Sequence, residues 1–176
     1  MTINLEALSD TIETAVRTAF TELKVRSGTE GLYAFALYSD EDAITLCPAA
    51  NTQEHLDSGA DQDDLAYYCF EPAEWKYEME GAEEAFAVIS RQLYEISLNE
   101  DRPSDFRDQL RDTCVGILEK LKAEGFFRSI TGQEVFLAYT VSDGDPEPAV
   151  MKSVITRLND NPYRDQYLAW MQTWED

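Results

Sequence analysis

The sequence predicts a fold of the α/β type, more closely α+β, in which a single domain spans residues 1–176. Its expected centre is a mixed, largely antiparallel sheet of about four strands covered by helices. Two patterns predict this. An uncharged, aromatic-rich run at residues 32–38 is typical of a strand buried on both faces. Apolar residues recur at steps of three and four in several longer segments, as in amphipathic helices.

The N-terminal part is predicted to contain one helix and one hairpin. Residues 4–26 have the helical spacing of apolar residues, with Asn4 as the N-cap. The strand at 32–38 is followed by a polar turn and a second short apolar run at 43–47, so the two runs are predicted to pair as a β-hairpin. We expect Pro48 to end the hairpin, because proline cannot donate to a strand ladder.

The middle of the chain carries weaker local signals. Residues 51–54 have the spacing of a capping box and predict a short helix that ends near Gly59. Leu65–Phe70 is short, apolar and aromatic, which predicts the third strand, with a helix as the alternative. Pro72 suits the first turn of a short helical segment that carries Trp75.

The remaining elements are predicted from periodicity. Long helices are expected over residues 82–96 and from Pro103 onward, followed by a last strand at 135–141. Two further helices, at 150–158 and 163–174, complete the chain. The predicted order is α-β-β-(α)-β-α-α-β-α-α, without an internal repeat or an interdomain linker.

The charge excludes several classes of partner. The chain has 35 acidic and 14 basic residues and a formal net charge of −21. Nucleic acids and anionic membranes are therefore not expected as partners, because their binding depends on Lys and Arg. The three cysteines are odd in number and lie in apolar settings, which predicts free thiols in a reducing compartment. With no signal sequence or membrane span recognised, the expected location is the cytoplasm.

No motif predicts a cofactor or a metal. His55 is the only histidine and is expected to be an ordinary surface residue. Asp61, Asp63 and Asp64 lack the glycine and glutamate of a calcium-binding loop, so they are interpreted as an acidic turn. The sequence contains no phosphate-binding glycine loop.

Several segments resemble an uncharacterised bacterial family, domain of unknown function 4303. The similar segments are residues 32–38, 47–52, 72–78 and 124–127, and the resemblance spans nearly the whole chain. It implies a compact bacterial α/β protein and provides no catalytic residues. Small acidic proteins of this type are associated with toxin-immunity loci, which is an analogy at the level of the family.

Residues 54–84 form the most informative region. They contain eleven acidic residues and one base, Lys76, and aromatic residues are interleaved with them. Aromatic residues surrounded by charge are typical of interaction surfaces. The alternative is that Trp75 and one tyrosine fill the sheet edge while the acids are merely solvated. The predicted partner-binding residues are Asp61, Asp63, Asp64, Tyr68, Glu71, Glu74, Trp75, Tyr77 and Glu78.

The favoured function is therefore a non-enzymatic, acidic interaction module, similar to an immunity or inhibitor protein, that binds a basic partner protein. Whether the protein is an enzyme stays open, because Glu71, Glu74 and Glu78 near Trp75 could act as acid-base groups or ligands for a small molecule or metal. A third interpretation, general salt adaptation, predicts evenly spread acids and is disfavoured by their clustering.

Overall fold

The computed structural model describes residues 5–59, 61–142 and 147–175. Its elements, with 3₁₀ helices written η, are α1 (Leu5–Ser27), β1 (Leu32–Ser39), β2 (Cys47–Thr52), α2 (Gln53–Gly59), η1 (Gln62–Asp64), α3 (Leu65–Phe70), η2 (Pro72–Glu74), β3 (Tyr77–Glu78), α4 (Glu83–Ser97), α5 (Phe106–Ala123), α6 (Phe126–Thr131), β4 (Phe136–Val141), α7 (Pro148–Leu158), α8 (Pro162–Met171) and η3 (Gln172–Glu175).

Within these residues, four strands form one mixed sheet in the order β3-β2-β1-β4. The central strand β1 pairs antiparallel with β2 and parallel with β4, and β2 pairs antiparallel with β3. Residues 32–37 of β1 are all buried, because helices cover both faces of the sheet. The predicted α+β fold with a four-stranded, largely antiparallel sheet is confirmed.

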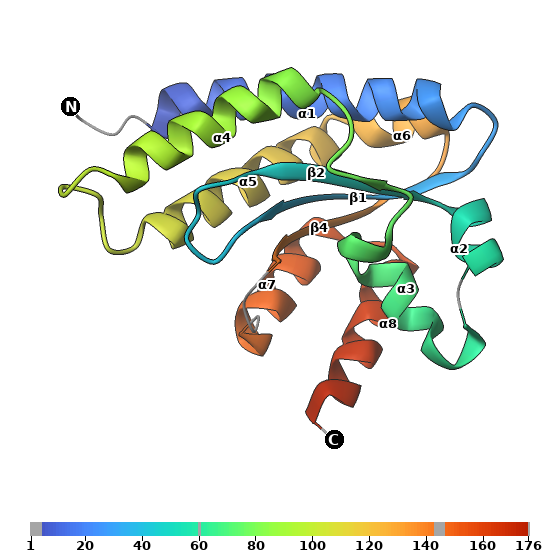
Figure 1. The fold of residues 1–176 in the computed structure, drawn as a ribbon. Helices are drawn as coiled ribbons and strands as arrows, with labels where there is room; N and C mark the ends of the chain where they lie inside the picture. The colour runs from blue at the N-terminus through green and yellow to red at the C-terminus, as the bar shows by residue number, and fades with distance from the viewer. Residues whose placement is uncertain (1–4, 60, 143–146, 176) are drawn as a thin grey trace.

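The molecule has three layers (Figure 1). Helices α1, α4, α5 and α6 lie on one side of the sheet, and α3, α7 and α8 lie on the other. Phe35 and Leu37 of β1 point into the first core, where the ring of Phe35 meets that of Phe20 edge to face at 5.4 Å. Ala34 and Ala36 belong to the second core, together with the larger Tyr33, so the two faces of β1 pack against different clusters.

The hairpin prediction is wrong about its second strand. The paired strand is Cys47–Thr52, and Pro48 lies inside it opposite Leu37. The carbonyl of Pro48 accepts a hydrogen bond from Met79 beyond β3, so its nitrogen also faces the β3 edge. A missing N–H is tolerated there because β3 is only two residues long.

The apolar run at residues 43–47 is mostly loop, although Ala43 and Leu46 are buried. The side chain of Asp40 holds this loop by accepting hydrogen bonds from the backbone of Asp42 at 2.9 Å and Ile44 at 3.1 Å, and from the hydroxyl of Thr45. A loop whose backbone is satisfied in this way can bury apolar side chains without forming a strand.

The third strand was also predicted at the wrong place. Leu65–Phe70 forms helix α3, which was the alternative, and the two-residue strand Tyr77–Glu78 takes the edge position instead. In α3 only Cys69 and Phe70 are buried, whereas Leu65 and Tyr67 are 39% and 40% exposed. The apolar and aromatic composition therefore reflects a helix with one buried end.

The other predicted helices are present, with small differences. Helix α1 ends at Ser27, and the predicted cap Asn4 lies outside the described residues. In the predicted capping box, Thr52 accepts from the N–H of His55 at 3.3 Å, while the side chain of Asn51 accepts from Thr52 and Lys76 instead. The short helix α6 was not predicted, because glycines precede and follow its six residues and leave no periodic pattern.

Candidate functional site

An open cleft lies in the layer formed by α3, α7 and α8. Its volume is about 800 Å³. Ala138 and Thr140 of the edge strand β4 line it, and the small side chain of Ala138 leaves space above the sheet. The other lining residues come from α3, η2, α7, α8 and η3: Asp64, Tyr67, Phe70, Glu71, Pro72, Pro148, Met151, Tyr167, Trp170 and Trp174.

Three aromatic residues, Tyr167 and Trp170 of α8 and Trp174 of η3, form one wall. The ring centroids of Tyr167 and Trp170 are 5.4 Å apart with an interplanar angle of 84°, and those of Trp170 and Trp174 are 4.9 Å apart at 87°. Tyr167 and Trp174 meet at 77°. The three lie on one helix face because their spacing is three and four residues. These angles show that each pair of rings is close to perpendicular. The ring of Phe70 stacks against that of Trp170, with their centroids 6.0 Å apart.

Glu71 provides the most unusual charge in the cleft. Its side chain is half-buried, and among the described residues no Lys, Arg or His forms an ion pair with it. Burial raises the pKa of this carboxyl, the hydrogen bond from Ala73 N–H opposes the rise, and repulsion by Glu74 and Glu78 adds to it. A carboxylate in this position favours a cationic ligand, which would restore the missing counter-charge.

The acidic residues predicted from sequence gather around this cleft. Asp64 and Glu71 line it, and Glu74 accepts a hydrogen bond from the hydroxyl of Tyr67 at 3.2 Å. Tyr68 packs against the ring of Tyr67 at 5.5 Å. The structure thus brings α3 and η2 together as one acidic and aromatic edge.

The other predicted acids lie further along the same surface. Glu78 is exposed on β3 and accepts from the hydroxyl of Tyr38 at 3.4 Å. Asp61 caps η1 by accepting from the N–H of Asp63 at 3.2 Å. Asp63 lines a second hollow of about 990 Å³, which shares Asp64, Tyr67, Phe70 and Trp170 with the first.

Trp75 and Tyr77 are not on the surface. They are 4% and 7% exposed. The indole N–H of Trp75 donates to the carbonyl of Cys69 at 3.2 Å, and Tyr77 pairs with Ala50 in the sheet. Both residues fill the edge of the sheet, as the alternative interpretation of this region has it. Aromatic contacts with a partner must therefore come from other residues.

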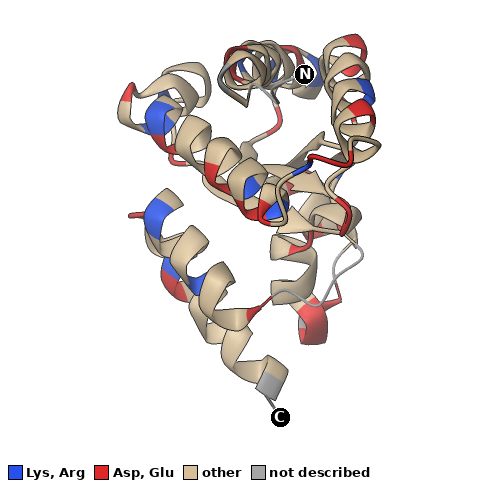
Figure 2. Cartoon of the chain, turned by 90° about the vertical axis from the view of Figure 1, so that its left-hand side faces the viewer, with Lys and Arg blue, Asp and Glu red and all other residues tan. Residues whose placement is uncertain are grey.

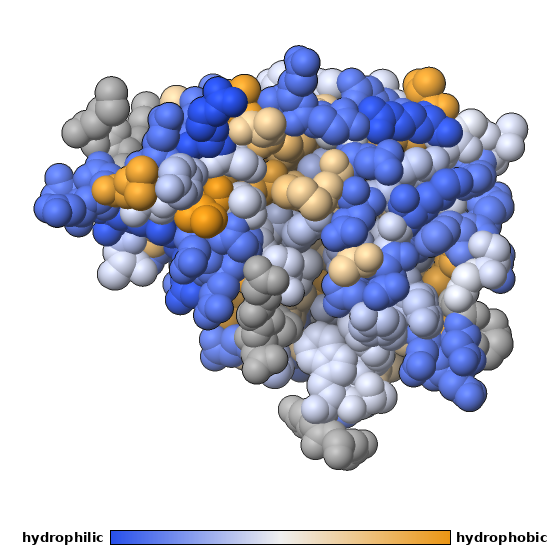
Figure 3. Space-filling model, in the orientation of Figure 1, coloured by the Kyte–Doolittle hydropathy of each residue, from blue (hydrophilic) through white to orange (hydrophobic). Residues whose placement is uncertain are grey.

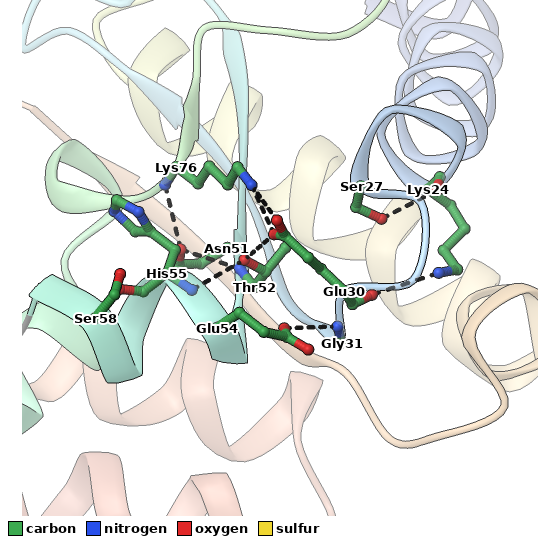
Figure 4. A network of polar contacts seen from close by, with 10 residues as sticks. All are labelled: Lys24, Ser27, Glu30, Gly31, Asn51, Thr52, Glu54, His55, Ser58 and Lys76. Atoms are coloured by element: carbon green, nitrogen blue, oxygen red, sulfur yellow. Dashed lines mark hydrogen bonds and ion pairs between the residues drawn. The ribbon is translucent and has the colours of Figure 1, made fainter.

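His55 belongs to a polar network that joins the ends of β1 and β2 to the β3 segment (Figure 4). Its Nε2 lies 3.3 Å from the carbonyl of Glu74. Lys76 pairs with Glu30 at 2.6 Å, and the hydroxyl of Thr52 donates to the same carboxylate at 2.7 Å. Because Glu30 engages Lys76, the one base of the acidic region does not offset the carboxylates at the cleft.

The described residues also bear on metal binding, on nucleophilic catalysis by a thiol and on membrane insertion. No group of three or more His, Cys, Asp and Glu in that part of the chain is placed to hold a metal ion. Burial raises the pKa of the Cys47 thiol, which is the opposite of what an activated nucleophile needs. None of the helices in the described ranges is both long and apolar enough to cross a lipid bilayer.

The remaining surface is mixed. Asp and Glu occur on the helices of both layers (Figure 2). Hydrophobic residues lie over the region of α4 (Figure 3), where Val88, Tyr94 and Leu98 are 45%, 52% and 67% exposed. Only the cleft beside α8 combines exposed aromatic rings with a half-buried acid among the features described above.

Sequence reasoning did not identify the wall formed by α8 and η3. Tyr163, Tyr167, Trp170 and Trp174 recur at steps of four, three and four, which predicted a helix packed on the core. Tyr167 is buried as expected, but Trp170 is half-buried and Trp174 is 37% exposed. The available signal was the presence of two tryptophans in this stretch, because tryptophan is large and rarely fully buried.

The comparisons with known proteins give one match. No curated protein and no solved structure was found to match the chain. A family model described as "Domain of unknown function (DUF4303)" matches residues 12–160, which is most of the sequence and includes α3, η2 and β4. The resemblance noted in the sequence is confirmed, and the chain belongs to the DUF4303 family.

Proposed function

We propose that this protein is a non-enzymatic interaction module of the bacterial cytosol that binds a basic partner protein through the cleft beside α8. The most specific form of this proposal is an immunity or inhibitor role. One observation carries it: the half-buried carboxylate of Glu71 has no cationic partner among the described residues and faces a cleft walled by tyrosine and tryptophan. Tyrosine and tryptophan are enriched at the energetic centres of protein interfaces.

The electrostatics of the surface support a basic partner. The chain carries a net charge of −21, and Asp64, Glu71 and Glu74 lie at or beside the cleft. Carboxylates gathered on one side attract a cationic protein over long distances and orient its approach. Aromatic rings inside the cleft then provide contacts of short range, which govern dissociation.

An enzyme remains the second candidate because of one observation. A cleft carboxyl with a raised pKa is typical of a general acid, and repulsion from Glu74 and Glu78 contributes to that rise. The lining residues include neither His, Cys, Lys nor Arg within the described ranges. The cleft therefore offers no cation to hold an anionic substrate and no thiol or imidazole to attack one, which favours binding over catalysis.

The test is capture of partners from a bacterial lysate at low salt, followed by measurement of the affinity with the purified partner. Trp170→Ala removes an aromatic wall residue, and Glu71→Gln removes the charge while it keeps a hydrogen-bond acceptor for Ala73. Tyr94→Ala and Glu95→Gln are matched controls, because both residues are exposed on α4 in the opposite layer.

We expect the captured partner to be basic and its Kd to rise about tenfold or more in Trp170→Ala and Glu71→Gln. The two α4 controls should bind like the unaltered protein. The proposal fails if the partners are acidic or neutral, or if the cleft variants and the α4 variants bind equally well. A small molecule that is turned over by the unaltered protein but not by Glu71→Gln would establish the enzyme instead.

A further inference from the structure

We infer that the group held in this cleft is the guanidinium of an arginine side chain, in preference to the ammonium of lysine. The inference rests on the proposed function and specifies the chemistry of the partner. It follows from the aromatic wall, the desolvated carboxylate and the free acceptor positions of that carboxylate.

The aromatic wall suits a flat cation. Trp170 and Trp174 are nearly perpendicular, so a ligand beside them meets the face of one ring and the edge of another. A guanidinium is planar and delocalised, so it can stack on an aromatic face. Its N–H groups then point outward in the plane of the guanidinium and remain free to donate hydrogen bonds. An ammonium has no flat face and gains only the point-charge part of this attraction.

Desolvation acts in the same direction. Glu71 is half-buried beside Phe70, Tyr167 and Trp170, so a cation that reaches it must lose much of its hydration. Guanidinium is more weakly hydrated than ammonium, and its transfer into such a site costs less. For a strongly hydrated ammonium, contact with Asp64, which lines the cleft but is exposed, would be the better choice.

The carboxylate of Glu71 also has room for a two-pronged contact. The described hydrogen bond to its side chain is the one from Ala73 N–H to Oε1, at a long 3.4 Å. A carboxylate can accept about four hydrogen bonds, and arginine presents two parallel N–H groups that match its two oxygens. Lysine can donate only from a single nitrogen.

The same combination occurs elsewhere in this chain. The guanidinium of Arg17 lies 5.2 Å from the centroid of the Phe126 ring and pairs with Glu13 at 2.9 Å and Glu124 at 2.5 Å. Arg102 lies 4.7 Å from the ring centroid of Phe106 and donates to the backbone carbonyl of Asp42, so it shares only the aromatic part of the arrangement. Arg17 thus shows that this fold can hold a guanidinium between an aromatic ring and carboxylates. Lys76 lies 5.4 Å from the ring centroid of Tyr77 and pairs with Glu30, so the preference for arginine rests on the three points above and not on this precedent.

The experiment titrates the whole protein, labelled with ¹⁵N, with N-acetyl-L-arginine amide and, separately, with N-acetyl-L-lysine amide at constant ionic strength. The indole N–H signals of Trp170 and Trp174 report on the cleft. The indole N–H signal of Trp75 is an internal reference, because Trp75 is buried and its indole N–H donates a hydrogen bond to the carbonyl of Cys69. Glu71→Gln tests the carboxylate, and Glu95→Gln on α4 is the matched control.

We expect Trp170 and Trp174 to shift with a Kd about fivefold or more lower for the arginine probe, while Trp75 stays in place. Glu71→Gln should weaken arginine binding by about threefold or more without moving Trp75, and Glu95→Gln should not. Equal affinities for the two probes, shifts that survive Glu71→Gln, or no shift up to about 50 mM probe would overturn the inference.

The probe titration and the partner-binding test can fail independently of each other. If a basic partner needs the cleft but the two probes bind equally, the arginine inference fails and the function stands. If the arginine probe binds selectively but no partner depends on Trp170 or Glu71, the cleft has the inferred preference and the function as a protein-binding module fails.

Discussion

The side chain of Asn159 pairs with the backbone of Leu137 as a neighbouring strand would. Its Nδ2 donates to the carbonyl of Leu137 at 2.8 Å, and its Oδ1 accepts from the N–H of Leu137 at 2.9 Å. Leu137 lies on β4, the edge strand next to β1, and Asn159 is fully buried. One amide thus satisfies two backbone groups that a buried sheet edge would otherwise leave unpaired.

Asn159→Ala is therefore expected to lower the free energy of unfolding by about 2–3 kcal/mol, because it leaves a buried donor and a buried acceptor unsatisfied. Urea denaturation followed by circular dichroism measures the loss. Lys152→Ala, an exposed change on α7, should stay within about 0.5 kcal/mol. Equal stability of the two variants would show that the amide does not support the edge.

The centre of β1 should be still more sensitive to truncation. Phe35 is fully buried and packs edge to face on Phe20, so Phe35→Ala should cost about 3–5 kcal/mol. Asp108 is exposed and pairs with Arg111 on the same helix at 2.7 Å, and Asp108→Ala should change stability by about 0.5 kcal/mol or less. If chemical denaturation finds both variants alike, the role of β1 as the central strand is wrong.

The three cysteines should be free and slow to react in the native protein. Cys69 and Cys114 are buried, and Cys47 is half-buried. Burial raises the pKa of the Cys47 thiol and raises that of Cys69 to about 11, so little reactive thiolate forms near neutral pH. Thiol titration should find Cys47 first and all three after unfolding without reductant. Fewer than three would indicate a disulfide or a modified cysteine.

Two glutamates should affect the pH dependence of stability with opposite signs. Burial raises the pKa of Glu71, so the folded state holds this proton more tightly than the unfolded state. Ionised Glu71 therefore destabilises the fold above its raised pKa, and Glu71→Gln should be more stable than the unaltered protein near neutral pH. The difference should vanish as the pH falls below the ordinary carboxyl value near 4.5.

Glu83 is the matched opposite case. The hydrogen bond from Arg26 lowers the pKa of the Glu83 carboxyl to about 2. The ionised carboxylate therefore stabilises the fold above about pH 4.5, and this stabilisation is lost as the pH falls toward 2. Glu83→Gln should accordingly be less stable near neutral pH. Thermal unfolding of both variants between acidic and neutral pH measures the two trends. The same sign for both would contradict the environment described for Glu71.

The acidic residues and the aromatic wall should affect different rate constants of binding to a basic partner. Replacing Asp61, Asp63 and Asp64 with Asn should lower the association rate and its salt dependence, since steering of this kind contributes about 10–1,000-fold. Raising the ionic strength from 0.15 M, where the Debye length is about 8 Å, should slow association of the unaltered protein.

Trp170→Ala should instead raise the dissociation rate, because the aromatic wall acts after encounter. Surface plasmon resonance at several salt concentrations resolves the two rates. An association rate that does not depend on salt would contradict electrostatic steering. Trp75→Ala is not a useful probe of binding, since Trp75 is buried and its loss would destabilise the fold.

The elements that the sequence predicted well are those with one dominant pattern. The uncharged runs of β1 and β4 and the apolar spacing of α1, α4 and α5 each allow one interpretation. Leu65–Phe70 was misassigned because aromatic residues favour strands locally, whereas packing of Phe70 against Tyr167 and Trp170 stabilises a helix. The loop after β1 was misassigned because Asp40 satisfies its backbone, a contact that no periodicity reveals.

The candidate site was predictable only in its charge. The acids around α3 and η2 follow from composition, and the structure places Asp64, Glu71 and Glu74 at or beside one cleft. Exposure is decided by tertiary packing, so sequence could not show that Trp75 is buried and Trp174 is exposed. Nor could it show that α8, far away in the sequence, lines the same cleft as Glu71.

The two sides of the cleft differ in how they relate to the family. The matched region ends at residue 160, so it includes α3, η2 and β4 but stops before α8 begins at Pro162. The acidic side is thus part of what the family model describes, and the wall of Tyr167, Trp170 and Trp174 is not. The cleft therefore joins a segment inside the matched region to one outside it, and it exists only where α8 packs against α3.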